Sequence, residues 1–207
     1  SIRPKLLLHN SDHIIAVSEH TKDDVVRMYG IGQERISVVH SGVSESSSPV
    51  PPLHVQRVKR TYHLPEKFLL FVGTQEPRKN IIGVIRSYAA IAHSVPQHLV
   101  IAGERGWKVG KLGAAILSSP YSDKIHSIGF VLEEDKAALY AAADLFVYPS
   151  FYEGFGFPPL EAMLAGTPAV VSFNSSLPEV VGQWATMIDP YNTPQLASVL
   201  QELLLTP

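Results

Sequence analysis

Two carboxylates lie in one short run of glycines, aromatic residues and prolines, "YEGFGFPPLE", which covers residues 152–161. Glu153 stands beside glycines that let the backbone approach a ligand closely, and Glu161 follows two prolines of the kind found at the start of a helix. An ionised carboxylate accepts hydrogen bonds from sugar hydroxyls, whereas loop amides at a helix N-terminus bind phosphate. The run therefore suits a sugar nucleotide. Glu161 alone is equally well explained as a first-turn carboxylate that complements the helix dipole.

The complementary positive charges lie in a second loop, "EPRKN", where Arg78 and Lys79 precede an apolar helical pattern. Either cation could neutralise a diphosphate. Seen alone, such residues are more often solvated surface charges that stabilise little. Their interpretation depends on whether this loop faces the acidic one.

Six apolar runs alternate with helical patterns after residue 67, which predicts a doubly wound, mostly parallel, six-stranded α/β sheet of the Rossmann type. In the common strand order 3-2-1-4-5-6, the loops at 74–80 and 150–158 flank one crevice at the carboxyl ends of the strands. The expected strands are 68–73, 98–103, 125–130, 144–149, 167–172 and 185–189, and the expected helices are 80–94, 110–117, 133–143, 158–165, 177–182 and 193–205.

The first 40 residues predict one β-α-β unit, with strands at 13–18 and 35–40 around a helix that ends at Gly30. The Ser- and Pro-rich composition that follows has little capacity to pack and is typical of a hinge. We therefore divide the chain into a remnant of an N-terminal domain with its hinge (1–45), a linker (46–66) and a ligand-binding domain (67–207). Because the chain opens without Met in mid-fold, we expect a fragment.

The composition argues against several classes of ligand and partner. The net charge is −2, and no block of Lys or Arg dominates, which argues against nucleic acid as a partner. Cysteine is absent and the nine His show no metal-ligand spacing, so we expect no metal and no bound cofactor. Apolar runs fall short of the ~20 residues of a membrane span. We expect a cytoplasmic protein and leave open peripheral contact with the inner face of the membrane in the full-length protein.

A family resemblance covers about Phe68 to Asn192. "FLLFVGTQEPRKN", "LVIAGERGW", "DPYN" and the long stretch from "IHSIGF" through the E-x7-E element at Glu153 and Glu161 resemble the C-terminal, donor-binding half of the retaining family 4 glycosyltransferases, which have the two-domain GT-B fold. The opening "SDHIIAVSEHTKDDVVRMYGIGQERISVVHSGVS" resembles that family's crossing between its two domains. The resemblance implies that most of an N-terminal acceptor domain is missing.

Carried over, the resemblance implies that Glu153 holds the donor sugar, Lys79 the diphosphate and Glu161 the ribose hydroxyls. We also expect Gly73, Thr74 and Arg78 to contact the donor. Many members have Arg directly after the strand-end glycine, but here Thr74 follows Gly73, so which of Thr74 and Arg78 takes that role is left open. The family also implies two sets of main-chain contacts. The base is held near Gly129 to Val131. The sugar and diphosphate are held by the backbone of Gly154, Phe155, Gly156 and Phe157.

The expected function is retaining transfer of a hexosyl group from a nucleoside diphosphate sugar, with GDP-mannose the best guess, to a saccharide or lipid-linked acceptor. In the family's front-face route the leaving phosphate takes the acceptor's proton. We expect the fragment alone to be inactive. The alternative is a nucleotide-sugar-binding module without catalysis. An NAD-dependent oxidoreductase is disfavoured because G-x-G-x-x-G does not follow the first strand. The sequence spacing of Glu153 and Glu161 is compatible with the carboxylate pair of a glycosidase. Their phosphate-type surroundings argue against that alternative.

Overall fold

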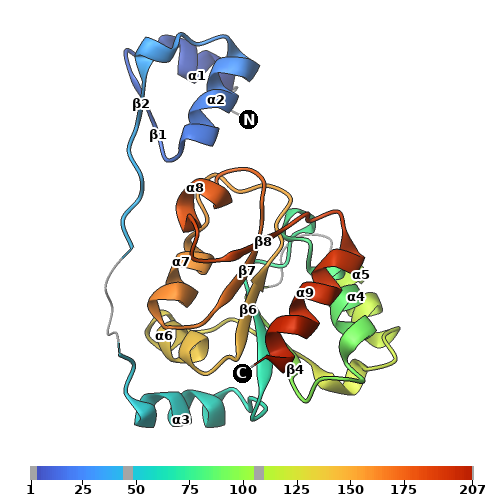
Figure 1. Ribbon diagram of the computed structural model, residues 1–207. Coiled ribbons are helices and arrows are strands. Elements are labelled where there is room, and N and C mark those ends of the chain that lie inside the picture. Colours follow the sequence, from blue (N-terminus) through green and yellow to red (C-terminus); the bar gives the residue numbers. More distant parts are fainter. Residues whose placement is uncertain (1–3, 44–48, 105–109, 207) are drawn as a thin grey trace.

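The computed structural model describes residues 4–43, 49–104 and 110–206. They form a small N-terminal module (residues 4–43) that lies above a larger α/β domain (residues 49–206) (Figure 1). The module contains the expected β-α-β unit, with a short parallel sheet over a core of Ala16, Ile31 and Ile36. Its elements are α1 (Pro4–Asn10), β1 (Ile14–Ala16), α2 (Glu19–Tyr29) and β2 (Ile36–Val38).

Helix α2 begins and ends where its sequence predicts. The Ser18 side chain accepts a hydrogen bond from the Thr21 amide, and Glu19 places a carboxylate in the first turn, both of which stabilise a helix start. Gly30 ends the helix with φ 68°, a left-handed conformation that glycine adopts without strain.

The α/β domain has one fully parallel sheet in the order β5-β4-β3-β6-β7-β8. Numbered within the domain this is 3-2-1-4-5-6, so the predicted fold class and strand order are confirmed. Observed strands end within about two residues of the expected ones: β3 (Phe68–Val72), β4 (His98–Ala102), β5 (Ile125–Gly129), β6 (Leu145–Tyr148), β7 (Ala169–Ser172) and β8 (Thr186–Ile188).

Helices cover both faces of the sheet (Figure 1). On one face α4 packs on α5 and α9. On the other face α3 packs on α6, α6 packs on α7, and α7 packs on α8. Their bounds are α3 (Pro52–Thr61), α4 (Ile81–Ile91), α5 (Gly110–Leu117), α6 (Glu133–Ala141), α7 (Phe157–Leu164), α8 (Leu177–Val181) and α9 (Thr193–Leu205). Within the described ranges no helix is long and apolar enough to span a bilayer.

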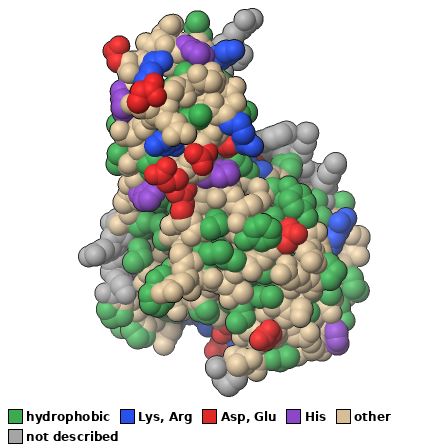
Figure 2. All heavy atoms as spheres, turned by 45° about the horizontal axis from the view of Figure 1, so that its top comes forward, with side chains coloured by type: hydrophobic (Ala, Val, Ile, Leu, Met, Phe, Trp, Pro, Cys, Tyr) green, Lys and Arg blue, Asp and Glu red, His purple; other side chains and the backbone are tan. Residues whose placement is uncertain are grey.

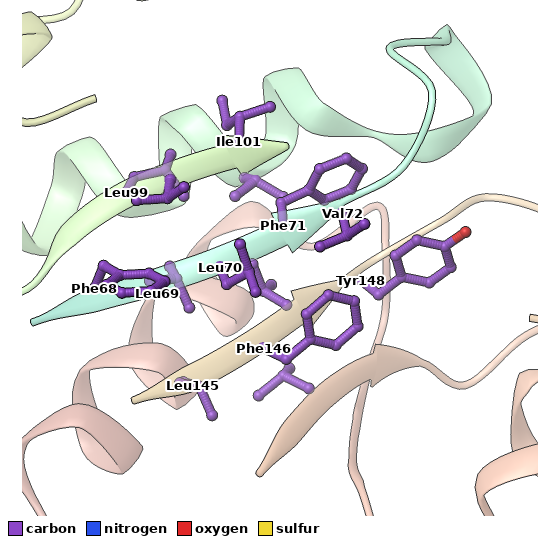
Figure 3. Packing of buried hydrophobic residues seen from close by; sticks show 14 of the residues in the cluster. Phe68, Leu69, Leu70, Phe71, Val72, Leu99, Ile101, Leu145, Phe146 and Tyr148 are labelled. Atoms are coloured by element: carbon purple, nitrogen blue, oxygen red, sulfur yellow. The ribbon is translucent and has the colours of Figure 1, made fainter. Parts of the chain in front are cut away.

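The covered sheet explains the unbroken apolar runs in the sequence. Every residue of β3 and β6 is buried, as expected for parallel strands with helices on both faces. Figure 3 shows the side chains of β3, β4 and β6 packed together, with the Tyr148 hydroxyl at the end of β6. The packed centre thus fixes the strand ends from which the loops of the candidate site begin.

The prediction of a linker over residues 46–66 is wrong for residues 52–61. Residues 44–48 lie outside the described part, but α3 packs on α6, and Val58 is fully buried in the main core. Tyr62 donates a 3.0 Å hydrogen bond to Asp135 of α6, which also pairs with Arg57. The basic residues concealed an apolar stripe at Val55, Val58 and Tyr62, whose spacing places them on one helix face.

Candidate functional site

The basic and acidic loops meet at the carboxyl ends of the neighbouring strands β3 and β6. Lys79 Nζ lies 2.7 Å from Glu153 Oε1, and Arg78 Nη1 lies 2.8 Å from Glu153 Oε2. The Phe151 amide also donates a 2.8 Å hydrogen bond to the Arg78 carbonyl. The structure therefore brings Arg78, Lys79 and Glu153 together, as the strand order predicted.

The two cations occupy different environments. The side chains of Lys79 and Glu153 are only 9% and 7% exposed, whereas that of Arg78 is 46% exposed. Burial lowers the pKa of Lys79, and the charge of Glu153 offsets only part of this effect. Burial also acts to raise the pKa of Glu153, but the charge and hydrogen bond of Lys79 outweigh it and the pKa lies below its ordinary value. The site is a largely desolvated ion pair with a more accessible guanidinium at its edge.

Tyr148 is a member of this cluster that the sequence interpretation missed. The Lys79 ammonium donates a hydrogen bond to the Tyr148 hydroxyl and lies 4.8 Å from the centre of its ring. Burial, followed by the negative charge of Glu153, raises the pKa of Tyr148 well above its ordinary value, so the phenol stays neutral. A tyrosine at the end of an otherwise apolar buried strand was the available signal, because a buried phenol needs a polar partner.

Three consecutive polar residues after β7 hold the loop that carries Glu153. Asn174 donates to the Phe151 carbonyl at 2.8 Å, and the Ser175 hydroxyl accepts from the Glu153 amide at 3.0 Å. Ser176, which is fully buried, donates to the carbonyls of Glu153 and Phe155 at 3.0 and 2.7 Å. Ser175 has φ 54°, an uncommon conformation that clusters at functional sites. The backbone on both sides of the Glu153 side chain is therefore fixed.

Beyond Glu153 the loop offers unbonded amides. Within the part of the chain that the structure describes, the amides of residues 154–157 donate no hydrogen bond. Gly156 precedes α7 with φ 109°, a backbone conformation that strains any residue other than glycine, and a Cβ atom there would also displace Leu177 Cδ2 at 2.6 Å. Pro158 and Pro159 lack N–H groups, so the loop supplies more of the donors than the first helical turn does. This refines the expected anion site.

Glu161 does not join the Lys79–Glu153 cluster. Its carboxylate accepts a 2.7 Å hydrogen bond from Tyr140 of α6, and Lys136 Nζ lies 4.0 Å from its other oxygen. Helix α7 begins at Phe157, and its first turn holds no acidic residue, so the expectation of a first-turn carboxylate is wrong. The side chain is 25% exposed, which leaves it open to a ligand at the α6 side of the crevice.

The other predicted residues lie in the loops after β3 and β5. The Gly73 carbonyl would lie 2.1 Å from a Cβ at Gly103, which has φ 130°. Only a glycine therefore allows the loops after β3 and β4 to approach so closely. Thr74 is exposed and has no contact with Lys79 or Glu153 among the described bonds. Val131 is buried two residues after the end of β5, a strand that lies two positions from β3 in the sheet.

Two aromatic side chains complete the loop after β6. Phe155 is 8% exposed and meets Phe157 edge-on, with ring centres 5.2 Å apart, whereas Phe157 stays 41% exposed. In the predicted role, these residues contact the sugar and diphosphate through their backbone and not through their rings.

A cavity of about 550 Å³ lies beside the ion pair. Its walls come from the loop after β3 and the first turns of α4, together with Leu112, Phe151, Pro190, Tyr191 and Thr193. Neither Lys79 nor Glu153 lines it. Among the residues that the structure describes, no three His, Asp or Glu side chains converge as a metal-binding group.

Comparison with known families identifies the class. Residues 55–207 match the model described as "Glycosyl transferases group 1", and residues 2–47 match "Glycosyltransferase Family 4". The chain therefore belongs to the group 1 glycosyltransferase family, as the resemblance predicted.

Two curated relatives are mannosyltransferases by name. The chain is 36% identical over 200 residues to "O-antigen chain mannosyltransferase B" of Escherichia coli, covering 95% of this chain and 52% of that protein. It is 28% identical over 199 residues to "O-antigen chain mannosyltransferase RfbU" of Salmonella typhimurium, covering 96% and 53%. The chain thus spans about half the length of these two relatives.

Solved structures support the GT-B fold. Anabaena Alr3699/HepE, in complex with UDP and glucose, superposes with a TM-score of 0.84 at 20% identity and covers 95% of this chain and 54% of that one. Sucrose-phosphate synthase from Thermosynechococcus elongatus gives 0.83 at 25% identity, covering 99% and 52%.

Proposed function

We propose that this chain is the donor-binding part of a retaining glycosyltransferase that moves a mannosyl group from GDP-mannose to a saccharide or lipid-linked acceptor. One observation carries the proposal: the buried Glu153 carboxylate lies between Lys79 and Arg78 and beside amides that donate no hydrogen bond to any described residue. Cations and free amides suit a diphosphate, and the carboxylate suits the hydroxyls of the attached sugar.

In the free protein, Glu153 is neutralised by the two cations, so a ligand must exchange partners with it. A diphosphate entering the site draws the charges of Lys79 and Arg78 toward its oxygens. Glu153 then accepts hydrogen bonds from the sugar hydroxyls while the diphosphate replaces it as the counter-charge. This exchange favours the intact nucleotide sugar, since only that ligand supplies both the anion and the hydroxyls.

During transfer, negative charge develops on the departing diphosphate. Lys79 and the amides of residues 154–157 are placed by the fold before the ligand arrives, and preorganised charges of this kind stabilise a transition state more than mobile solvent does. The leaving phosphate takes the proton of the attacking hydroxyl, so this route needs no protein base and retains the anomeric configuration. It also requires no metal or bound cofactor.

The nucleoside lies toward the α6 side of the crevice in this proposal. Tyr140 occupies one oxygen of Glu161, and the second oxygen, 4.0 Å from Lys136, has room for a ribose hydroxyl. The base then lies near Gly129 to Val131. The choice of mannose draws on the names of the relatives, and the choice of a nucleotide sugar agrees with the UDP and glucose complex named for Alr3699/HepE.

The acceptor part of the enzyme lies outside this chain in the proposal, because the chain covers about half of its relatives. Holding the acceptor in place contributes ~7–11 kcal/mol toward a transfer barrier. We therefore expect the 207-residue chain to bind donor and to release nucleotide only by slow hydrolysis. The alternative, a binding module in a protein without transferase activity, shares the donor site and differs in this activity.

The experiment compares GDP, UDP, ADP and TDP, and then GDP-mannose, by thermal shift and calorimetry with the 207-residue chain. A ligand that binds the folded state raises its apparent stability, and we expect GDP and GDP-mannose to give the largest shifts. Glu153→Gln should abolish the preference for GDP-mannose over GDP and preserve GDP binding. Glu161→Gln, the control carboxylate on the following helix α7, should weaken both ligands equally. Binding of neither GDP nor any other nucleotide would refute the proposed site.

A further inference from the structure

We propose that Ser18 and Thr21 of the N-terminal module are positioning residues for the donor sugar. They hold the carbonyl of Gly154, the residue after Glu153, and so set the direction of the Glu153 carboxylate. This inference rests on the proposed function of Glu153, and it adds a role for two residues that lie 136 and 133 positions before Gly154 in the sequence.

The contact is short and partly buried. The Ser18 hydroxyl lies 2.7 Å and the Thr21 hydroxyl 3.1 Å from the Gly154 oxygen, and the two hydroxyls lie 2.8 Å apart. Ser18 is fully buried. One carbonyl oxygen can accept two hydrogen bonds, so the Gly154 oxygen is within reach of a donor from each hydroxyl. The same Ser18 oxygen accepts from the Thr21 amide at the start of α2, which ties the contact to the helix itself.

The module also holds the residue on the other side of Glu153. Tyr152 donates a 2.7 Å hydrogen bond to Asp24 of α2, which also pairs with Arg27. The hydrogen bond from Tyr152 is the largest influence lowering the pKa of Asp24, so this carboxylate is charged at neutral pH. Helix α2 therefore contacts both neighbours of Glu153.

A separate contact fixes α2 against the α/β domain. Glu179 of α8 accepts hydrogen bonds from the amides of Glu19 and His20 at 2.9 and 3.2 Å. These amides are among the unpaired donors of the first helical turn, and a carboxylate there is further stabilised by the helix dipole. Figure 2 shows acidic, basic and His side chains gathered over the module and its junction with the larger domain.

Together these bonds distinguish a positioning role from simple adhesion. Bonds from Ser175 and Ser176 already fix the amide and carbonyl of Glu153, and the Ser18–Thr21 pair fixes the next carbonyl. Adhesion between two parts could be achieved anywhere along their surface, whereas these hydroxyls act on the peptide beside the sugar-binding carboxylate. Catalytic and binding groups need such support to stay within a few tenths of an ångström of the productive geometry.

The test measures the affinities of GDP and GDP-mannose by calorimetry for the wild-type chain and for the double variant Ser18→Ala/Thr21→Val. We expect the preference for GDP-mannose over GDP to fall by about tenfold, the scale of one net hydrogen bond, and GDP affinity to stay within about twofold. Thr21→Ser keeps the hydroxyl and should retain the wild-type preference.

The chain offers a matched control, Asn192→Ala/Thr167→Val. Asn192 caps α9 as Ser18 caps α2, and the Thr167 hydroxyl donates to the Tyr140 carbonyl at 2.6 Å. This variant loses one helix cap and one buried threonine hydrogen bond away from Glu153. It should lower the melting temperature comparably while leaving the GDP-mannose preference unchanged.

The outcomes separate the two proposals. A wild-type chain that prefers GDP-mannose, with a double variant that keeps that preference, overturns the positioning role and leaves the proposed function intact. Equal loss of preference in the matched control also overturns it, because general destabilisation then explains the effect. A wild-type chain that binds neither probe overturns both. If the double variant is unfolded at the assay temperature, Thr21→Val alone is measured, and an unchanged preference in that folded variant is decisive against the inference.

Discussion

The Lys79–Glu153 pair makes a quantitative prediction that can be tested without any ligand. Lys79→Met removes the ammonium and keeps most of the side-chain volume, leaving Glu153 with Arg78 as its cation. Breaking a fully buried ion pair costs about 3–5 kcal/mol. Because Arg78 remains 2.8 Å away and its side chain is 46% exposed, we expect a smaller loss of about 2–3 kcal/mol in the free energy of unfolding.

A double-mutant cycle with Glu153→Gln isolates the pair. Each single variant leaves a buried charge with a weaker partner, whereas the double variant leaves none, so it should recover at least about 1.5 kcal/mol relative to additivity. The matched control is the Lys136–Glu133 pair, which has the same 2.7 Å separation but an 83% exposed carboxylate. Its coupling energy should stay below about 0.5 kcal/mol.

The stabilisation from the Lys79–Glu153 pair should decrease in acid. The pKa of Glu153 is lowered in the folded protein, so the stabilisation is present above the pKa of the unfolded carboxyl, near 4.5, and is lost as pH falls through the folded value. Removing Lys79 raises that folded pKa. The difference in unfolding free energy between wild type and Lys79→Met should therefore be largest near neutral pH and shrink in acid. Urea titrations at pH 7 and pH 4 measure this difference. A difference below about 0.5 kcal/mol that is the same at both pH values would refute the reasoning.

Three further predictions follow from the same geometry. Lys79→Ala should weaken GDP binding by about 1.5–3 kcal/mol and leave guanosine binding unchanged, as measured by calorimetry; equal GDP affinity would exclude Lys79 from the diphosphate site. Gly103→Ala should destabilise the fold by more than about 2 kcal/mol in urea titrations, because its Cβ would lie 2.1 Å from the Gly73 oxygen at φ 130°. Transfer by the complete two-domain enzyme should survive EDTA, and a loss restored only by a divalent ion would contradict the metal-free route.

The sequence predicted the sheet because its signals are local. Apolar runs such as 68–72 and 98–102 are long, uninterrupted and separated by helical patterns, and right-handed crossovers leave few ways to connect them. The approach of Lys79 to Glu153 followed from the strand order, since neighbouring parallel strands place their terminal loops side by side.

The parts that could not be predicted depend on contacts between distant residues. The bonds from Asn174, Ser175 and Ser176 to the Glu153 loop come from a stretch whose composition is typical of any turn. Likewise, nothing in the local pattern around Glu161 indicates Tyr140 as its partner. Side-chain partners across elements are set by tertiary packing, which a single sequence does not display.

Helix α3 has a practical consequence for isolating the α/β domain. A truncation that begins at residue 67, where the apolar strands start, would delete Val58 from the core and remove Tyr62, Arg57 and His54 from Asp135, a carboxylate whose side chain is 1% exposed. An expression boundary at about residue 49 keeps that helix and its partners. The same boundary omits Ser18 and Thr21. Comparing the chain from residue 49 with the 207-residue chain therefore separates the residues that fold the domain from those that orient its donor loop.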